Sequence, residues 1–312
     1  MNQFVEDLLG LNGWALELIL WVQSWSNSFL DAGFWAITQL GYEPAYLVIV
    51  PVVYWCINRS WGARLFLLVI LSTWVNEALK NLLRQPRPDP SVVRQLDPSY
   101  GYGLPSNHAQ TGGVIVWGYL AAKIRRPWFT VLAVIMIFLI GFSRIYLGAH
   151  FPMDVVSGWL LGLLVLGLML TYEDRLIGWF GRLSGAGQAG IVLGLALLIL
   201  FATPADNLHR YPAATAADLS GLMLGAGFGW LLEQRTVRFR VEGSLGRKVV
   251  RYLVGTVVIL AVYLAGHLIP DSPSWAVQVG IDALQLAAVA LAAVWLGPWV
   301  FVRLHLAESD LD

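Results

Sequence analysis

The chain has 312 residues, of which 57% are apolar and 13% are charged. Soluble domains carry roughly 45–50% apolar and about 25% charged residues, so this composition excludes an ordinary soluble domain. The 20 basic and 20 acidic residues balance, which gives no sign of a nucleic-acid partner. The single cysteine, Cys56, excludes an intrachain disulfide, and we interpret it as a small buried apolar side chain.

The N-terminal segment combines tryptophans with charged and amide side chains. Its first ten residues hold two acidic residues and no basic one, so we expect no cleavable signal peptide. Between residues 5 and 40, bulky aromatic residues alternate with polar ones, which favours helices lying in the membrane interface. We therefore predict an interfacial amphipathic segment over residues 1–42.

Nine later segments are candidate membrane spans, for which about 20 apolar residues are needed, and the first and sixth of them are short. They are Glu43–Ile57, Ala63–Leu83, Asn107–Lys123, Trp128–Leu147, Met153–Tyr172, Gln188–Ala202, Thr215–Leu232, Val249–Ile269 and Ala276–Val302. The pattern predicts an all-α polytopic membrane helical bundle with about nine spans. We expect a catalytic core over residues 43–187 and additional transmembrane helices over residues 188–312.

Basic residues predict the orientation of this bundle, because cytoplasmic loops carry an excess of them. Of the 20 basic residues, 14 fall on one side, which we assign to the cytoplasm. The opposite side holds Lys80, Arg84, Arg87, Arg94, Arg144 and Arg210. This second side would face the periplasm or exterior in a bacterium, or a lumen in a eukaryote. We expect a bacterial inner membrane.

The first of three ionisable clusters on the outer side combines cations with prolines. Lys80, Arg84 and Arg87 follow one another at i, i+4 and i+7, which places them on one face of a helix. Pro86 and Pro88 end that helix. Three cations on one face favour an anion between them, although a snorkelling basic helix end is the alternative.

The second cluster, Pro105-Ser106-Asn107-His108, opens a new helix. Ser106 is a suitable N-cap, and a helix N-terminus with free N–H groups suits a phosphate. Taken alone, the cluster is equally consistent with a plain cap followed by an interfacial histidine.

The third cluster runs from Ser143-Arg144 to His150 and Asp154, with Pro152 suited to the first turn of the next helix. His150 and Asp154 then lie about one turn apart. Asp154 can accept a hydrogen bond from one imidazole nitrogen and leave the other free to attack. An aspartate at membrane depth is costly and suggests function.

Together, these clusters resemble the signature of the type 2 phosphatidic acid phosphatase (PAP2) superfamily. Its pattern is Lys-x6-Arg-Pro, then Pro-Ser-Gly-His, then Ser-Arg-x5-His-x3-Asp. The chain matches it from Lys80 to Arg87-Pro88, at residues 105–108 and from Ser143 to Asp154. Asn107 stands where glycine is usual. We expect function to survive there, because that position donates its backbone N–H and asparagine tolerates unusual backbone angles.

The resemblance implies a chloroperoxidase-like core and a metal-independent phosphatase without a cofactor. It assigns the nucleophile to His150, its orientation to Asp154 and proton transfer to His108. It assigns phosphate binding to Lys80, Arg87, Ser106, Asn107 and Arg144. Arg84 is a secondary candidate. We interpret Arg94 as solvated. We interpret Asp206, Asp218, Asp271 and Asp282 as residues that cap helices in water, with a substrate entry path as the alternative.

A site at the outer ends of spans implies a lipid substrate and the bilayer as partners. Candidate substrates are an isoprenyl diphosphate, phosphatidate, phosphatidylglycerol phosphate and a sphingoid-base phosphate. The sequence does not separate them, and it predicts no oligomeric state. A head-group phosphotransferase would use the same residues and stays open. A lipid transporter stays open too, although it would not need His150 and Asp154 at this spacing.

Overall fold

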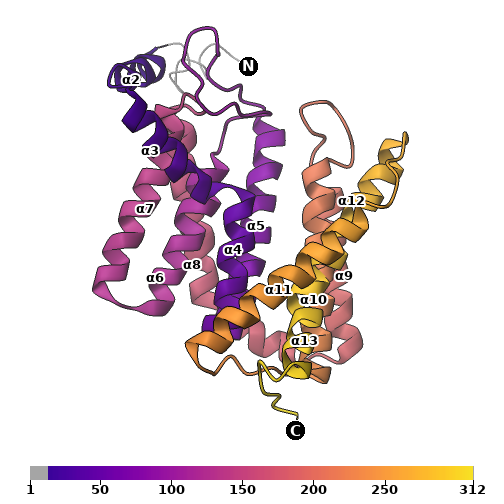
Figure 1. The fold of residues 1–312 in the computed structure, drawn as a ribbon. Helices are drawn as coiled ribbons and strands as arrows, with labels where there is room; N and C mark the ends of the chain where they lie inside the picture. Colours follow the sequence, from indigo (N-terminus) through magenta and orange to yellow (C-terminus); the bar gives the residue numbers. More distant parts are fainter. Residues whose placement is uncertain (1–12, 312) are drawn as a thin grey trace. The chain divides into compact units, whose positions relative to one another are not determined.

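The computed structural model describes residues 13–311, which fold into helices joined by loops (Figure 1). Within this range the only β pairing is one isolated antiparallel bridge between Phe239 and Ser309. The prediction of an all-α fold is therefore confirmed. The helices form two compact units, one of residues 13–47 and 71–171 and one of residues 48–70 and 172–311.

The first unit carries all three of the ionisable clusters. Its helices are α2 (Trp14–Gln23), α3 (Ser28–Thr38), η1 (Gln39–Gly41), η3 (His108–Gly118), α6 (Tyr119–Ile124) and α7 (Pro127–Tyr146). Three further helices contribute residues to both units, namely α4 (Glu43–Pro51), α5 (Arg59–Leu83) and α8 (Pro152–Arg182).

The helix ends in this unit follow local rules. The Asn27 side chain caps α3 by accepting hydrogen bonds from the backbone N–H groups of Phe29 and Leu30. Pro127 and Pro152 occupy the first turns of α7 and α8, where a missing N–H costs no hydrogen bond. The short segment between α7 and α8 therefore ends one helix and starts the next, and it holds His150.

Seven helices within the described range are long and apolar enough to cross a membrane. An eighth is counted if Ser28–Gly41 and Glu43–Ile57, bent by 59°, form one broken span. The predicted span at 107–123 is the short helix formed by η3 and α6, of which η3 is a π-helix. The prediction of about nine spans is thus close to the observed number.

The structure describes the predicted interfacial segment from residue 13 onward. Residues 1–12 lie outside the described residues. α2 has ten residues, and its face with Trp14 and Trp21 is exposed, as suits a helix in the membrane interface. α3 and η1 form the first half of the bent pair, whose second half is Glu43–Ile57.

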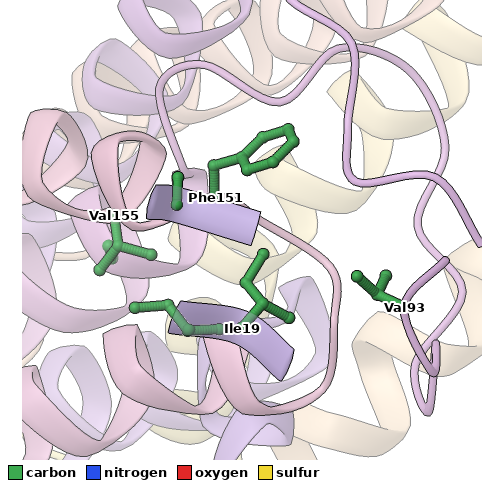
Figure 2. Close-up of a cluster of buried hydrophobic side chains, with 7 residues drawn as sticks. Ile19, Val93, Phe151 and Val155 are labelled. Atoms are coloured by element: carbon green, nitrogen blue, oxygen red, sulfur yellow. The ribbon is translucent and has the colours of Figure 1, made fainter. Parts of the chain in front are cut away.

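The inner face of α2 packs on the segment that follows His150. Ala15 and Ile19 are fully buried in a cluster that also holds Phe151, Val155 and Val93 (Figure 2). Gln23 adds two hydrogen bonds from its side-chain amide, one to the carbonyl of Arg94 and one to that of Tyr146. α2 therefore holds the loop between α5 and η3 against the end of α7.

The second unit is a helical bundle built around close helix contacts. It contains η2 (Val52–Ile57), α9 (Gly185–Ala202), α10 (Ala214–Thr236), α11 (Leu245–Gly266), α12 (Trp275–Leu291), η4 (Ala292–Leu296) and α13 (Gly297–Arg303). A Cβ added at Gly225 of α10 would lie 2.0 Å from the carbonyl oxygen of Ala287 in α12. Small residues therefore bring these two backbones together, as is common in membrane bundles.

Candidate active site

His150 and Asp154 form a hydrogen-bonded pair at the start of α8. Nδ1 of His150 lies 3.1 Å from Oδ2 of Asp154, and the two side chains are 2% and 0% exposed. The spacing of four residues lets His150, in the segment just before α8, reach Asp154 in the first turn of that helix, as the sequence predicts. The pair is thus removed from water and held in one geometry.

Arg87 fixes the tautomer of His150. Its Nη1 lies 2.8 Å from Nε2 of His150. A guanidinium only donates, so Nε2 accepts and carries no proton. The remaining ring proton is then on Nδ1, which donates to Asp154. The nitrogen with the lone pair therefore faces a cation, where an anionic substrate would also be drawn.

Burial keeps His150 neutral by lowering its pKa well below the ordinary value. The charges of Arg87, Arg144 and Lys80 lower that pKa further. A neutral imidazole has a lone pair for attack, whereas an imidazolium has none. The site therefore favours the form of the residue that can act as a nucleophile.

Asp154 also connects the second and third clusters. Its Oδ1 accepts a 2.8 Å hydrogen bond from Nε2 of Gln85, and Oδ2 accepts one from the backbone N–H of Phe151. Its backbone carbonyl accepts a hydrogen bond from the N–H of Ser106. The sequence reasoning missed Gln85, although a glutamine between Arg84 and Pro86 at the end of a span is a usable signal.

The predicted helical face of three cations is wrong. α5 ends at Leu83, and Arg84 adopts a left-handed conformation with a φ of 54°. Arg84 is exposed and bonds back to the carbonyl of Asn81, so it lies outside the site. Arg87 reaches His150 from the loop, where its side chain also donates to the carbonyls of Gly101 and Ala149.

Two predictions about the second cluster are also corrected. The Ser106 hydroxyl caps no helix, because it makes no hydrogen bond among the described residues. Asn107 has ordinary helical angles, φ −67° and ψ −34°, so this position needs no unusual backbone. Its side-chain oxygen instead accepts a 2.7 Å hydrogen bond from Thr111.

A buried polar network ties this helix start to α5. Gln110 donates to the Ser72 carbonyl and accepts from the Asn76 amide, which also donates to the carbonyl of Pro105. The Ser72 and Thr111 hydroxyls lie 2.8 Å apart. Paired polar groups at this depth fix one relative position of the two helices. The network therefore sets where Ser106, Asn107 and His108 lie.

His108 is held between an aromatic ring and a glycine. The Tyr42 ring meets its imidazole edge to face, with centroids 4.3 Å apart. A Cβ on Gly41 would lie 2.5 Å from Cδ2 of His108, so only glycine leaves room for the ring. The residues around η1 therefore position a histidine that is far from them in the sequence.

Arg144 is buried and largely engaged by side chains outside the three clusters. It is 1% exposed and forms an ion pair with Asp97 of the loop between α5 and η3. Its Nη1 donates to the Thr38 hydroxyl and its Nη2 to the Ser99 hydroxyl, each at 2.7 Å. The sequence reasoning missed all three partners, because a loop aspartate and two hydroxyls have no distinctive spacing.

Three predicted site residues present buried polar atoms that lack a partner among the described residues. They are Oγ of Ser106, Nε2 of His108 and Nε of Arg144. Each such atom costs about 1–3 kcal/mol when left unsatisfied. Lys80, Arg87 and Arg144 act electrostatically on the His108 imidazole as well. A phosphoryl group is an anion with several acceptor oxygens, so its chemistry complements the Ser106 hydroxyl and the Nε–H of Arg144.

A pocket of about 680 Å³ opens beside Arg87. Its wall is polar at Arg87 and Ser99 and apolar at Leu16, Val92 and Phe151. Phe151 follows His150 directly, so the pocket adjoins the site. Among the described side chains, no group of three or more His, Cys, Asp or Glu residues could hold a metal ion.

Two family models match the chain, and together they cover more than half of it. The PAP2 superfamily model matches residues 61–177, which include all three clusters. The model for the transmembrane extension of PAP2 superfamily phosphatases matches residues 217–309. The chain belongs to the PAP2 superfamily. With its apolar helices, this membership identifies it as an integral membrane protein.

Curated relatives of this PAP2 protein are phosphatases of lipids by name. It is 29% identical over 247 residues to lipid phosphate phosphatase delta of Arabidopsis thaliana, covering 73% of this chain and 58% of the relative. It is 30% identical over 236 residues to a probable sphingosine-1-phosphate phosphatase of Dictyostelium discoideum, covering 70% and 56%. The chain thus spans little more than half of these relatives.

Bacterial proteins are also similar to this PAP2 chain. Phosphatidylglycerophosphatase B of Bacillus subtilis is 27% identical over 167 residues, which cover 49% of this chain and 78% of the relative. A solved PAP2-type phosphatidylglycerolphosphate phosphatase from the same organism is 21% identical, with a TM-score of 0.45. That match covers 52% of this chain and 85% of the other.

Two further basic residues of the predicted outer side, Arg94 and Arg210, have structural partners. Arg94 is half-exposed and pairs with Asp31 at 2.6 Å, so it clamps the loop to α3 and is more than solvated. In the second unit, Arg210 pairs with Asp206 and lies 4.0 Å over the Trp275 ring. These contacts account for both arginines without assigning them to the site.

Proposed function

We propose that this PAP2 protein is a lipid phosphate phosphatase that hydrolyses a phosphomonoester or diphosphate head group through a phosphohistidine intermediate. One observation carries the proposal. His150 lies between Asp154 at 3.1 Å and Arg87 at 2.8 Å, with its unprotonated nitrogen on the Arg87 side. This arrangement places an unprotonated ring nitrogen beside a cation that can bind phosphate, which supports a nucleophilic attack on phosphorus.

In the first step, the Nε2 lone pair of His150 forms a bond to phosphorus while the bond to the lipid oxygen breaks. Arg87 moves from Nε2 to a phosphoryl oxygen when the substrate binds. Protonated His108 gives its proton to the leaving oxygen. Asp154 stabilises the positive charge that develops on the His150 ring.

In the second step, water attacks phosphorus and the bond to His150 breaks. His108 takes the proton from that water, which releases inorganic phosphate and restores both histidines. Lys80, Arg87 and Arg144 stabilise the negative charge on the phosphoryl oxygens in both steps, and the Ser106 hydroxyl and the Asn107 N–H donate to them.

The pocket beside Arg87 supports a lipid as substrate. Its apolar wall of Leu16 and Phe151 would contact the hydrocarbon next to the head group, while Arg87 binds the phosphate. Several relatives are named for sphingosine-1-phosphate and one for undecaprenyl diphosphate. We therefore assign the substrate class as a membrane lipid with a terminal phosphate or diphosphate.

We further propose that the site faces the periplasm or exterior of a bacterial inner membrane, because most basic residues fall on the other side. Residues 43–187 would form the catalytic core and residues 188–312 an accessory set of helices. Impermeant labelling of single cysteines placed at Gly101 and Gly243 tests the orientation. Labelling at Gly243 from outside would reverse it.

The activity is tested by phosphate release from purified full-length protein in detergent with a chelator present. The panel holds sphingosine phosphate, phosphatidate, phosphatidylglycerol phosphate and undecaprenyl diphosphate. We expect release by the wild type, none by His150→Ala, and unchanged release by Arg84→Ala, whose side chain is exposed. A product that needs a second lipid as acceptor would indicate a phosphotransferase, and lipid movement without phosphate release a transporter.

A further inference from the structure

A second group of residues, outside the sequence signature, surrounds Arg144 and His108. Asp97 accepts a 2.5 Å hydrogen bond from the Tyr42 hydroxyl through the same oxygen, Oδ2, that pairs with Arg144. The Asp97 side chain is 13% exposed and that of Arg144 is 1% exposed. The ion pair is therefore nearly dry, and its geometry is fixed by a third group.

Tyr42 contacts both ends of this arrangement. Its hydroxyl binds Asp97, its ring packs edge to face on the His108 imidazole at 4.3 Å, and Cζ of Arg144 lies 5.7 Å from the ring centroid. One side chain thus touches the proposed proton donor and the carboxylate that holds a proposed phosphate ligand.

The contacts of Arg144 leave a defined part of its guanidinium free. Of its five N–H donors, the two on Nη1 point to Thr38 and Asp97, and one on Nη2 points to Ser99. Nε is buried without a partner in the described part of the chain. One N–H on Nε and one on Nη2 remain, and two guanidinium donors of this kind can bind oxygens of one phosphoryl group.

We infer that Asp97 and Tyr42 are positioning residues of this site. Asp97 orients Arg144 so that its Nε–H faces the phosphoryl group. Tyr42 fixes the positions of both the Asp97 carboxylate and the His108 ring. The inference rests on the proposed phosphatase reaction. It assigns to the loop between α5 and η3 a role in transition-state binding, in addition to its contact with α2.

The experiment uses the full-length protein with Asp97→Glu, Asp97→Asn, Tyr42→Phe and the double variant Tyr42→Phe/Asp97→Asn. Asp97→Glu keeps the charge and moves the carboxylate, so it separates position from charge. A misplacement near 1 Å can cost on the order of 100-fold in rate, so we expect both Asp97 variants to lower kcat by about tenfold or more. KM should stay within about threefold, because the lipid contacts are unchanged.

Tyr42→Phe keeps the ring on His108 and removes only the hydroxyl, so we expect kcat to fall by about threefold to tenfold. In the Asp97→Asn background the same change should cost less than about twofold, because the hydroxyl acts through Asp97. The matched control is Asp31→Asn, which breaks the pair with Arg94 in the same loop without touching Arg144. It should keep kcat within about twofold.

The inference would be overturned if Asp97→Glu had the same kcat as the wild type. It would also be overturned if the loss of kcat in the double variant equalled the product of the losses in the two single variants. A wild type that releases no phosphate from any lipid overturns the proposed function separately. In that case, the affinity for orthovanadate, measured by calorimetry, decides the inference. Weaker binding by Tyr42→Phe and Asp97→Glu than by wild type and Asp31→Asn supports it, and equal binding in all four overturns it.

Discussion

The Gln85 amide donates a 2.8 Å hydrogen bond to the oxygen of Asp154 that does not face His150. Both side chains are buried, with exposures of 1% and 0%. Asp154 is therefore held from two sides, by Gln85 on Oδ1 and by His150 and a backbone N–H on Oδ2. A residue just beyond the end of α5 thus orients the partner of the nucleophile at the start of α8.

Replacing Gln85 by leucine should lower kcat by about tenfold, because Asp154 loses the donor that fixes its second oxygen and becomes a less constrained partner for His150. Measuring phosphate release at saturating lipid tests this. Arg84→Ala, at the exposed neighbouring residue, should leave kcat unchanged. Equal kcat in Gln85→Leu and wild type would show that the backbone N–H of Phe151 suffices to orient Asp154.

The lowered pKa of His150 predicts a pH profile. Protonation removes the lone pair of the nucleophile, and burial shifts that protonation below the ordinary histidine pKa of about 6.5. The loss of activity caused by protonation of His150 should therefore appear only below pH 6.5. The acid limb of kcat/KM between about pH 4 and 8 measures this. An acid limb centred above pH 6.5 would contradict the assignment.

Replacing Gly41 by alanine should displace the His108 ring, because the new Cβ would lie 2.5 Å from Cδ2 of His108. General acid–base catalysis contributes about 100- to 10,000-fold, so partial misplacement should lower kcat by about tenfold or more. Gly33→Ala is the matched control, since nothing lies within 4 Å of a Cβ there. If Gly41→Ala retained full activity, the proposed proton donor would not depend on this position.

Replacing Leu16 by serine should raise KM for long-chain lipid phosphates several-fold, while kcat changes little. Leu16 lines the pocket beside Arg87, and each buried methylene group contributes about 0.8 kcal/mol to binding hydrocarbon. The KM for a short-chain analogue should change less. Leu20→Ser, on the same helix but outside the pocket lining, serves as the control. Equal KM values for both variants would exclude Leu16 as a lipid contact.

The second unit offers a stability test that is independent of catalysis. Glu233 is fully buried and pairs with Arg59 at 2.9 Å, and it also accepts the backbone N–H of Phe239. Removing one partner of a buried pair costs about 3–5 kcal/mol, so Glu233→Ala should markedly lower the thermal midpoint in detergent. The exposed Arg240–Glu242 pair is the control, because such pairs contribute about 0–1 kcal/mol. If the thermal midpoint of Glu233→Ala were as high as that of Glu242→Ala, the prediction would be refuted.

Local chemistry in the sequence was sufficient to predict much of the fold. Apolar composition requires helices whose backbone groups are satisfied internally, because lipid offers no hydrogen bonds. Proline fixes the first turn of α8, so the spacing of His150 and Asp154 predicts their contact. These features depend on neighbours within a few residues, and they were therefore readable without the structure.

Only the tertiary structure decided which residues complete the site. Helical spacing made Arg84 look equivalent to Arg87, yet α5 ends at Leu83. As a result, Arg84 bonds back to α5 while Arg87 contacts His150. Asp97 and Tyr42 reach Arg144 and His108 across large sequence separations, through packing that no local pattern encodes. Burial then lowers the pKa of His150, because desolvation depends on what the whole unit places around the side chain.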